Sequence, residues 1–177
     1  MTEGTPILEA GNLLRERARR LAHAESGVGR GETVELLEFR LASERYAFLA
    51  AAVDDVQPLR ELTALPCTPA FLRGIVNVRG RLVPVYDLKR FFALPQPGIT
   101  DMHRILLLRN QSMEIGILAD AVEGVLPVAL ADVLPPPPAW SGIGTEYIRG
   151  ITGDGLVVLD AGAILGDPAI VMDEEVP

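Results

Sequence analysis

The 177-residue sequence has few of the side chains on which most active sites depend. It contains one cysteine, Cys67, and two histidines, His23 and His103. A single cysteine excludes an internal disulfide and is typical of a reducing compartment. The two histidines lie far apart in the sequence, without other ligands at metal-binding spacing around them. We therefore expect neither a metal nor another cofactor.

Long apolar runs and net positive charge are also missing. No apolar stretch approaches the roughly 20 residues that span a bilayer. The N-terminus carries early acids in place of the apolar segment of a secretory signal. The formal net charge is −8, whereas nucleic-acid-binding proteins need a basic surface. We expect a cytoplasmic protein with no nucleic-acid partner and no direct insertion into the membrane.

The apolar residues that are present, 49% of the chain, follow the pattern of β-strands. From Val34 onward they alternate or form short runs, and Gly, Asn and Ser separate the runs. Short helical turns are expected at 88–92 and 161–165. This pattern predicts an all-β fold with strands at 34–41, 45–52, 74–79, 81–86, 104–109, 113–119, 122–127, 147–152 and 155–159.

The two ends of the chain depart from this pattern. Residues 6–24 repeat leucine and alanine at helical spacing, with arginine and glutamate on the other face. A glycine-rich joint follows at 26–31. We therefore expect residues 1–33 to form an N-terminal helical extension, and 168–177 to form an acidic tail outside the folded domain of 34–167.

The folded part contains an internal repeat. A shift of 69 residues places Tyr46–Ala50 over Ile115–Ala119 without a gap. Later in the chain Arg73-Gly74 matches Arg149-Gly150, and Asp87 matches Asp160. A unit of this size would bury only about 60% of its unfolded surface. The repeat therefore predicts two small β-barrels that pack together, one at about 34–92 and the other at about 104–165.

Candidate catalytic residues are few and scattered. Asp54 and Asp55 are adjacent carboxylates, but acid–base chemistry needs two carboxyls in different environments. Asp87 and Asp160 occupy equivalent strand ends, where an aspartate caps a helical turn. Cys67 lies between two prolines. A small hydrolase using Asp54, Asp55, Asp87 or Cys67 stays an alternative, and it requires a deep pocket with a perturbed carboxylate or thiol.

The most informative segment is the hairpin at 71–92, FLRGIVNVRGRLVPVYDLKRFF. Its glycines do not have the spacing of a phosphate-binding loop, so we expect them to allow positive φ or a close backbone approach. Arg73, Arg79 and Arg81 surround the hairpin, and arginine is favoured where proteins bind one another. The alternative is a solvated barrel rim.

This hairpin resembles a known signature. TPAFLRGIVNVRG at 68–80, followed by VPVYDL at 83–88, closely resembles the motif of chemotaxis coupling proteins, the CheW family. The second half carries a related segment, TEYIRG, at 145–150. The resemblance extends from about residue 34 to residue 165.

The resemblance implies both a fold and a function. The fold is two tandem five-stranded SH3-like β-barrels around a hydrophobic interface. The function is that of a non-enzymatic adaptor, which links the cytoplasmic tip of chemoreceptors to the regulatory domain of a CheA-type histidine kinase in membrane-associated arrays. An alternative within the family is the same coupling in a pathway for gliding, pili or development.

The resemblance also implies two sets of contact residues. Those expected to bind the receptor lie in or near the NxRG motif and at 53–56: Arg79, Asn77, Asp55, Val53 and Val56. Those expected to bind the kinase are the Arg-Gly pairs of the two halves: Arg73, Gly74, Arg149 and Gly150.

Overall fold

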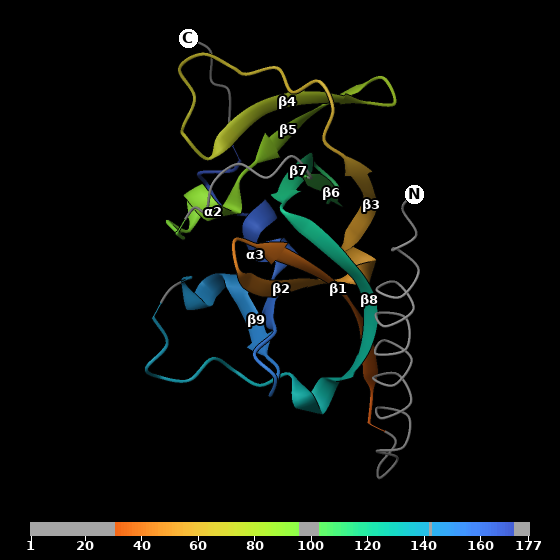
Figure 1. Ribbon diagram of the computed structural model, residues 1–177, viewed down its shortest axis with the longest axis vertical. Coiled ribbons are helices and arrows are strands. Elements are labelled where there is room, and N and C mark those ends of the chain that lie inside the picture. The colour runs from red at the N-terminus through yellow and green to blue at the C-terminus, as the bar shows by residue number, and fades with distance from the viewer. Residues whose placement is uncertain (1–30, 96–102, 142, 172–177) are drawn as a thin grey trace, which may run out of the picture. The chain divides into compact units, whose positions relative to one another are not determined.

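The computed structural model of this chain describes residues 31–95, 103–141 and 143–171 (Figure 1). The expected helix at 6–24, nearly all of the 1–33 extension and the end of the acidic tail lie outside these ranges. No helix in the described part is long and apolar enough to cross a membrane.

The described residues form two five-stranded sheets, which confirms the all-β fold. The first sheet has the order β8-β1-β2-β10-β9 and the second has the order β3-β6-β7-β5-β4. The first comprises β1 (Thr33–Leu41), β2 (Glu44–Leu49), β8 (Ala121–Ala129), β9 (Ile148–Ile151) and β10 (Val157–Leu159). The second comprises β3 (Val53–Pro58), β4 (Leu72–Val78), β5 (Arg81–Tyr86), β6 (Arg104–Arg109) and β7 (Glu114–Ala119).

Short helical turns connect some of these strands. They are α2 (Leu88–Phe91), α3 (Ala161–Leu165) and the 3-10 turns η1 (Ala50–Ala52), η2 (Leu130–Asp132) and η3 (Thr145–Tyr147). The expected caps are confirmed. The Asp87 carboxylate accepts a hydrogen bond from the Lys89 N–H at 3.0 Å, and the Asp160 carboxylate accepts one from the Ala163 N–H at 3.1 Å.

One strand is missing from the sequence-based prediction. The expected strand at 45–52 ends at Leu49, and after the turn η1 the chain forms β3. The segment Val53–Pro58 contains two adjacent aspartates and a proline, which hide the alternation. The repeat would have predicted this strand, because the shift of 69 places 53–58 over the predicted strand at 122–127.

The predicted division into barrels at 34–92 and 104–165 is wrong, because each sheet takes strands from both halves. β3 pairs with β6 of the second half, while β8 pairs with β1 of the first half. β4 and β5 also join β6 and β7, and β9 and β10 join β1 and β2. A repeat in the sequence shows how long each unit is, but it does not show whether a strand pairs within its own unit or with the other one. Exchange of equivalent strands between two like units leaves each strand with an equivalent neighbour.

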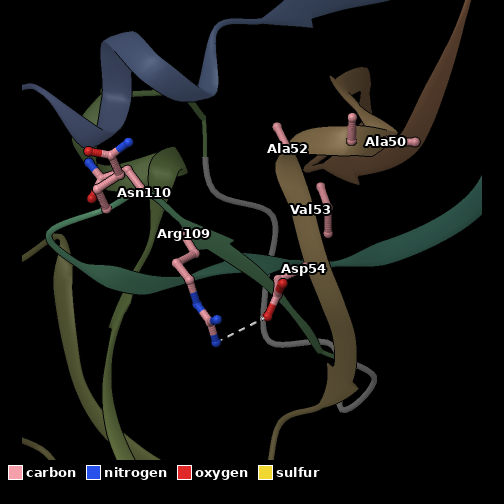
Figure 2. A pocket seen from close by; sticks show the side chains of 8 residues that line it. Ala50, Ala52, Val53, Asp54, Arg109 and Asn110 are labelled. Carbon is pink, nitrogen blue, oxygen red and sulfur yellow. Dashed lines mark ion pairs between the residues drawn. The ribbon is translucent and has the colours of Figure 1, made fainter.

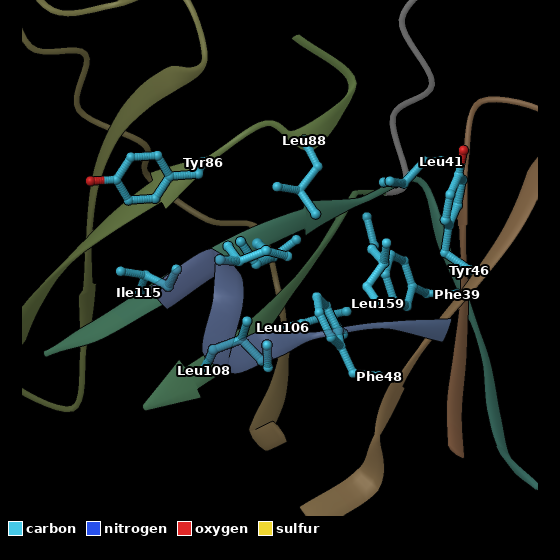
Figure 3. Packing of buried hydrophobic residues seen from close by; sticks show 14 of the residues in the cluster. Phe39, Leu41, Tyr46, Phe48, Tyr86, Leu88, Leu106, Leu108, Ile115 and Leu159 are labelled. Atoms are coloured by element: carbon cyan, nitrogen blue, oxygen red, sulfur yellow. The ribbon is translucent and has the colours of Figure 1, made fainter. Parts of the chain in front are cut away.

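The largest core cluster lies between the two sheets (Figure 3). It includes Phe39 and Phe48 of the first sheet, whose rings stack 5.2 Å apart, and Leu106 and Leu108 of β6. Neighbouring residues of β6 point the other way, into a second cluster inside their own sheet. β6 is therefore buried on both faces, as alternating side chains require.

The folded domain extends past its predicted end. Ile170 is 1% exposed and belongs to the core between the sheets. The Tyr86 hydroxyl donates a hydrogen bond to the Ile170 carbonyl oxygen at 3.0 Å. The tail predicted to begin at residue 168 therefore begins later, because an apolar residue there completes the core.

The Arg-Gly pairs mark where each sheet closes on itself. The segment after β3 bridges to β4 through Thr63 and Ile75, and the segment after β8 bridges to β9 through Leu134 and Ile151. A Cβ on Gly74 would overlap the Thr63 carbonyl, and Gly74 has a φ of +143°. A Cβ on Gly150 would overlap Val133. The expected close backbone approach is confirmed at Gly74 and the expected positive φ at Gly80, and Gly150 shows a close approach as the repeat counterpart of Gly74.

We predict that Gly74→Ala destabilises the protein by about 2–4 kcal/mol, because it adds both backbone strain and steric overlap. Chemical denaturation measures this free energy of unfolding. Gly153→Ala is the matched control, since nothing lies within 4 Å of the added Cβ and Gly153 has no positive φ. Equal stability of the two variants would contradict the close-approach argument.

Candidate functional site

The turn between β4 and β5 holds Arg79 in an uncommon conformation. Arg79 and Gly80 have φ values of +51° and +82°, and they connect the paired residues Val78 and Arg81. Two successive positive φ values define the tight hairpin turn that matches strand twist. The Asn77 side-chain oxygen accepts a hydrogen bond from the Gly80 N–H at 2.8 Å. Asn77 therefore fixes the turn that displays Arg79.

Arg79 reaches from this turn to β3. Its Nη2 lies 3.0 Å from Oδ2 of Asp55, and the two side chains are 74% and 31% exposed. Asp55 also accepts hydrogen bonds from the Val56 N–H at 2.8 Å and from the Gln57 side-chain amide at 2.9 Å. The structure thus brings into contact two residues that the family resemblance assigned to the same receptor contact. Asp55 is the fixed partner, and Arg79 remains largely open to solvent.

The hydrogen bonds to Asp55 favour its ionised form. The Gln57 amide has the largest effect in lowering the pKa of the Asp55 carboxyl, followed by the Val56 N–H. Partial desolvation opposes them, and the attraction of Arg79 adds a smaller decrease in the pKa. Asp55 is therefore a stable negative charge at neutral pH.

An exposed leucine lies beside this pair, and the sequence reasoning missed it. Leu82 is directly opposite Asn77 in the β4–β5 register and is 69% exposed. The sequence could have indicated it, because Leu82 is an apolar residue at a strand position where the alternating pattern predicts a polar, outward-facing one. We refer to Asn77, Arg79, Leu82 and Asp55 as the tip surface.

Val53 and Val56 lie at the edge of the core. Both are partly buried and pack against the cluster between the sheets. They therefore link the exposed end of β3 to the interior, and part of each side chain stays accessible for contact.

The four residues expected to bind the kinase lie on different sheets. Arg73 is on β4, with its guanidinium 4.0 Å from the buried carboxylate of Asp87, which also lies 3.6 Å from Arg90. Its repeat counterpart, Arg149, is exposed on β9. Gly74 and Gly150 lie at the two closure points described above. The two Arg-Gly pairs are therefore equivalent within their sheets but do not form one site.

The candidate catalytic residues have other roles. Asp54 pairs with Arg109 at 3.3 Å, and Glu123 pairs with Arg40 at 2.6 Å; a shift of 69 relates these two ion pairs. Asp87 caps α2, and Cys67 is exposed in a turn. The described residues contain no group of three or more His, Cys, Asp or Glu side chains that could hold a metal.

An open pocket of about 450 Å³ lies where η1 approaches the β6–β7 turn (Figure 2). Its lining residues are Ala50, Ala51, Ala52, Val53, Asp54, Arg109, Asn110 and Gln111. Asp54 is the one residue among the four hydrolase candidates that contributes to it. The pKa of Asp55 is lowered, which is opposite to the shift that a general acid needs. The geometry gives the hydrolase alternative no support.

Comparison with known proteins agrees with the fold. The model of the CheW-like domain matches residues 35–169. Chemotaxis protein CheW of Treponema pallidum is 31% identical over 136 residues, covering 73% of this chain and 80% of that protein. Protein FrzA of Myxococcus xanthus is 35% identical over 117 residues, covering 66% and 72%.

A solved structure shows the same arrangement. The scaffolding protein TtCheW of Thermoanaerobacter tengcongensis superposes with a TM-score of 0.67 at 31% identity, covering 73% of this chain and 85% of that structure. The double β-sheet fold and the match over most of the chain define a scaffold protein. This chain belongs to the CheW-like family.

We predict that the pKa of Asp55, followed by NMR titration of its carboxyl, lies below the ordinary aspartate value of about 3.9. Gln57→Leu should raise this pKa more than Arg79→Ala does, because the amide hydrogen bond is the larger cause. Since the folded-state pKa is lowered, the stability that Asp55 contributes is present above pH 3.9 or so and is lost as pH falls through the folded value. A larger increase in Arg79→Ala would contradict this order of causes.

Proposed function

We propose that this protein couples the cytoplasmic tip of a chemoreceptor to the regulatory domain of a CheA-type histidine kinase, as a non-enzymatic adaptor. The observation that carries the proposal is the tip surface. An exposed leucine and a largely exposed arginine lie together there, on a turn that Asn77 fixes. Arginine is enriched among the residues that contribute most to protein–protein binding, and an exposed apolar side chain beside it gains free energy when a partner removes it from water.

The receptor contact would use both halves of the tip surface. Contact with the receptor helices would bury the exposed apolar surface of Leu82 and remove it from water. Arg79 has further N–H donors beyond the one directed at Asp55, and an arginine can bind two acceptors at once. Asp55 keeps the guanidinium in place and so reduces the entropy lost on binding. Val53 and Val56 would extend this contact along β3.

The kinase would bind elsewhere, at the Arg-Gly pairs. Arg73 is exposed enough to contact a partner while Asp87 holds it, and Arg149 occupies the equivalent place on the first sheet. Gly74 and Gly150 would contribute by letting the chain come close at the sheet closures. Two separate surfaces allow one protein to bind receptor and kinase together. Such a protein would work in the cytoplasm, recruited to receptor arrays.

A second role keeps these contacts but serves another output, such as gliding, pili or development. The identity to protein FrzA, 35%, is higher than that to the T. pallidum chemotaxis protein, 31%. Deletion of the gene discriminates the two roles: loss of swimming responses supports the first, and loss of surface motility with normal swimming supports the second.

We predict that Arg79→Glu weakens binding to a receptor signalling-tip fragment by at least about tenfold, which corresponds to about 1.4 kcal/mol. The variant places a second negative charge beside Asp55 and removes the donors. Isothermal titration calorimetry measures the affinity, and a kinase regulatory-domain fragment should bind the variant as it binds the wild type.

Two variants sharpen this test. Arg40→Glu makes the same charge change in an exposed ion pair of the first sheet and should leave receptor binding unchanged. Asp55→Arg combined with Arg79→Glu restores an ion pair in reversed order. If the receptor contacts Arg79 itself, the reversed pair does not restore binding. Full recovery would show that the pair acts only within this protein.

A further inference from the structure

The internal repeat produces two equivalent corners that differ in one respect. In each corner a hairpin turn meets the segment that crosses from one sheet to the other. The first corner joins the β1–β2 turn, at Ala42, to residues 119–123. The second joins the β6–β7 turn, at Gln111, to residues 50–54. The shift of 69 residues maps the second onto the first residue by residue.

An aspartate fills the first corner. Oδ2 of Asp120 accepts a hydrogen bond from the Ala42 N–H at 2.6 Å. Its Oδ1 lies 2.7 Å from Nζ of Lys89 and 3.3 Å from Nε2 of His103. The Lys89 and Asp120 side chains are 9% and 14% exposed. This corner is therefore closed by a carboxylate that a turn N–H, the Lys89 ammonium and the His103 ring surround.

The second corner has alanine in place of that aspartate. Ala51 is the counterpart of Asp120, and the pocket of about 450 Å³ lies here (Figure 2). Gln111 is the counterpart of Ala42, and among the described residues its N–H donates no hydrogen bond. The acceptor that closes the first corner is thus absent from the second.

Arg109 provides the positive charge of the open corner. The counterparts of Lys89 and His103 are Gly162 and Val34, which carry no charge. The ion pairs of Arg109 with Asp54 and Glu114 both use Nη2, at 3.3 Å each. Its Nε and Nη1 make no ion pair with a described residue, so they can bind a further acceptor.

We propose that the open corner binds an acidic side chain of the chemoreceptor tip, which takes the place that Asp120 occupies in the closed corner. The proposal rests on the proposed receptor coupling. The carboxylate would accept from the Gln111 N–H and from the free N–H groups of Arg109, and charge-assisted hydrogen bonds of this kind are the stronger ones. In the closed corner Lys89 lies beside Asp120 and Arg40 beside Glu123; in the open corner Arg109 is the cation that would serve both Asp54 and the receptor acid.

The location favours the receptor over the kinase as the source of that side chain. Val53 and Asp54 line the pocket, and Asp55 of the tip surface is the next residue on the same strand. A receptor bound at the tip surface therefore needs to extend only along β3 to reach the corner. The contact would add specificity to the apolar contact at Leu82. A receptor acid out of position would be repelled by the Asp54 carboxylate and would not gain the attraction of Arg109.

The test supplies the missing carboxylate from within the chain. Ala51→Asp should occupy the corner by accepting from the Gln111 N–H, and should weaken binding of a receptor signalling-tip fragment at least about tenfold. Ala139→Asp adds the same charge at an exposed alanine outside the corner and should leave the affinity unchanged.

A double-mutant cycle identifies the partner acid without depending on Ala51→Asp. Each glutamate and aspartate of the receptor fragment is changed to its amide, and affinity is measured with the wild type and with Arg109→Gln. One of these changes should weaken binding to the wild type but have no further effect on Arg109→Gln.

The outcomes separate this inference from the proposed function. If the wild type does not bind the receptor fragment, both are overturned. If it binds, and Ala51→Asp binds equally well while no receptor acid is coupled to Arg109, the corner inference alone is overturned. Coupling of one acid to Arg109, with loss of affinity in Ala51→Asp, supports it.

Discussion

The packing of β6 against both sheets is the constraint on which the rest of the structure depends. Leu106 and Leu108 contribute to the core between the sheets, whereas Ile105 and Leu107 fill the interior of the second sheet. Strand β3 of the other half pairs with the edge of β6 and packs Val53 and Val56 against the core between the sheets. The exchange of strands thus follows from burial, since a single unit of about 65 residues leaves too much apolar surface exposed.

The open corner is a direct consequence of that exchange, whereas the tip surface is built within the first half of the chain. Asp55 lies on β3 and Arg79 on the turn after β4, and both strands belong to the second sheet because the first half of the chain crosses over. Had each half folded by itself, β3 would not pair with β6. The open corner joins Arg109 and Gln111 of the second half to residues 50–54 of the first, so the exchange is what places it at the start of the strand that carries Asp55.

Sequence patterns were most reliable where the signal is local. The hairpins, the helical turns capped by Asp87 and Asp160, and the close approach at Gly74 all depend on neighbouring residues, so composition and spacing predicted them. β3 was missed because its aspartates and proline resemble a loop, although the repeat could have located it. Leu82 was missed because an exposed apolar residue breaks the alternation used to find strands. Ile170 was assigned to the tail because the acidic residues that follow it are typical of an exposed segment, although Ile170 itself is apolar.

By itself the sequence determined the fold class, the two-unit composition and the family, because alternation, turn residues and a long motif are read along the chain. The tertiary structure decided which copy each strand pairs with, that Arg79 lies against Asp55, and that Ala51 leaves open a corner that Asp120 closes. These depend on contacts between residues distant in the sequence: Arg79 and Asp55 are 24 positions apart, and Ala42 and Asp120 are 78 apart. Two nearly equivalent repeats offer the same local pairings within and between copies, and only the burial of the whole core selects between them.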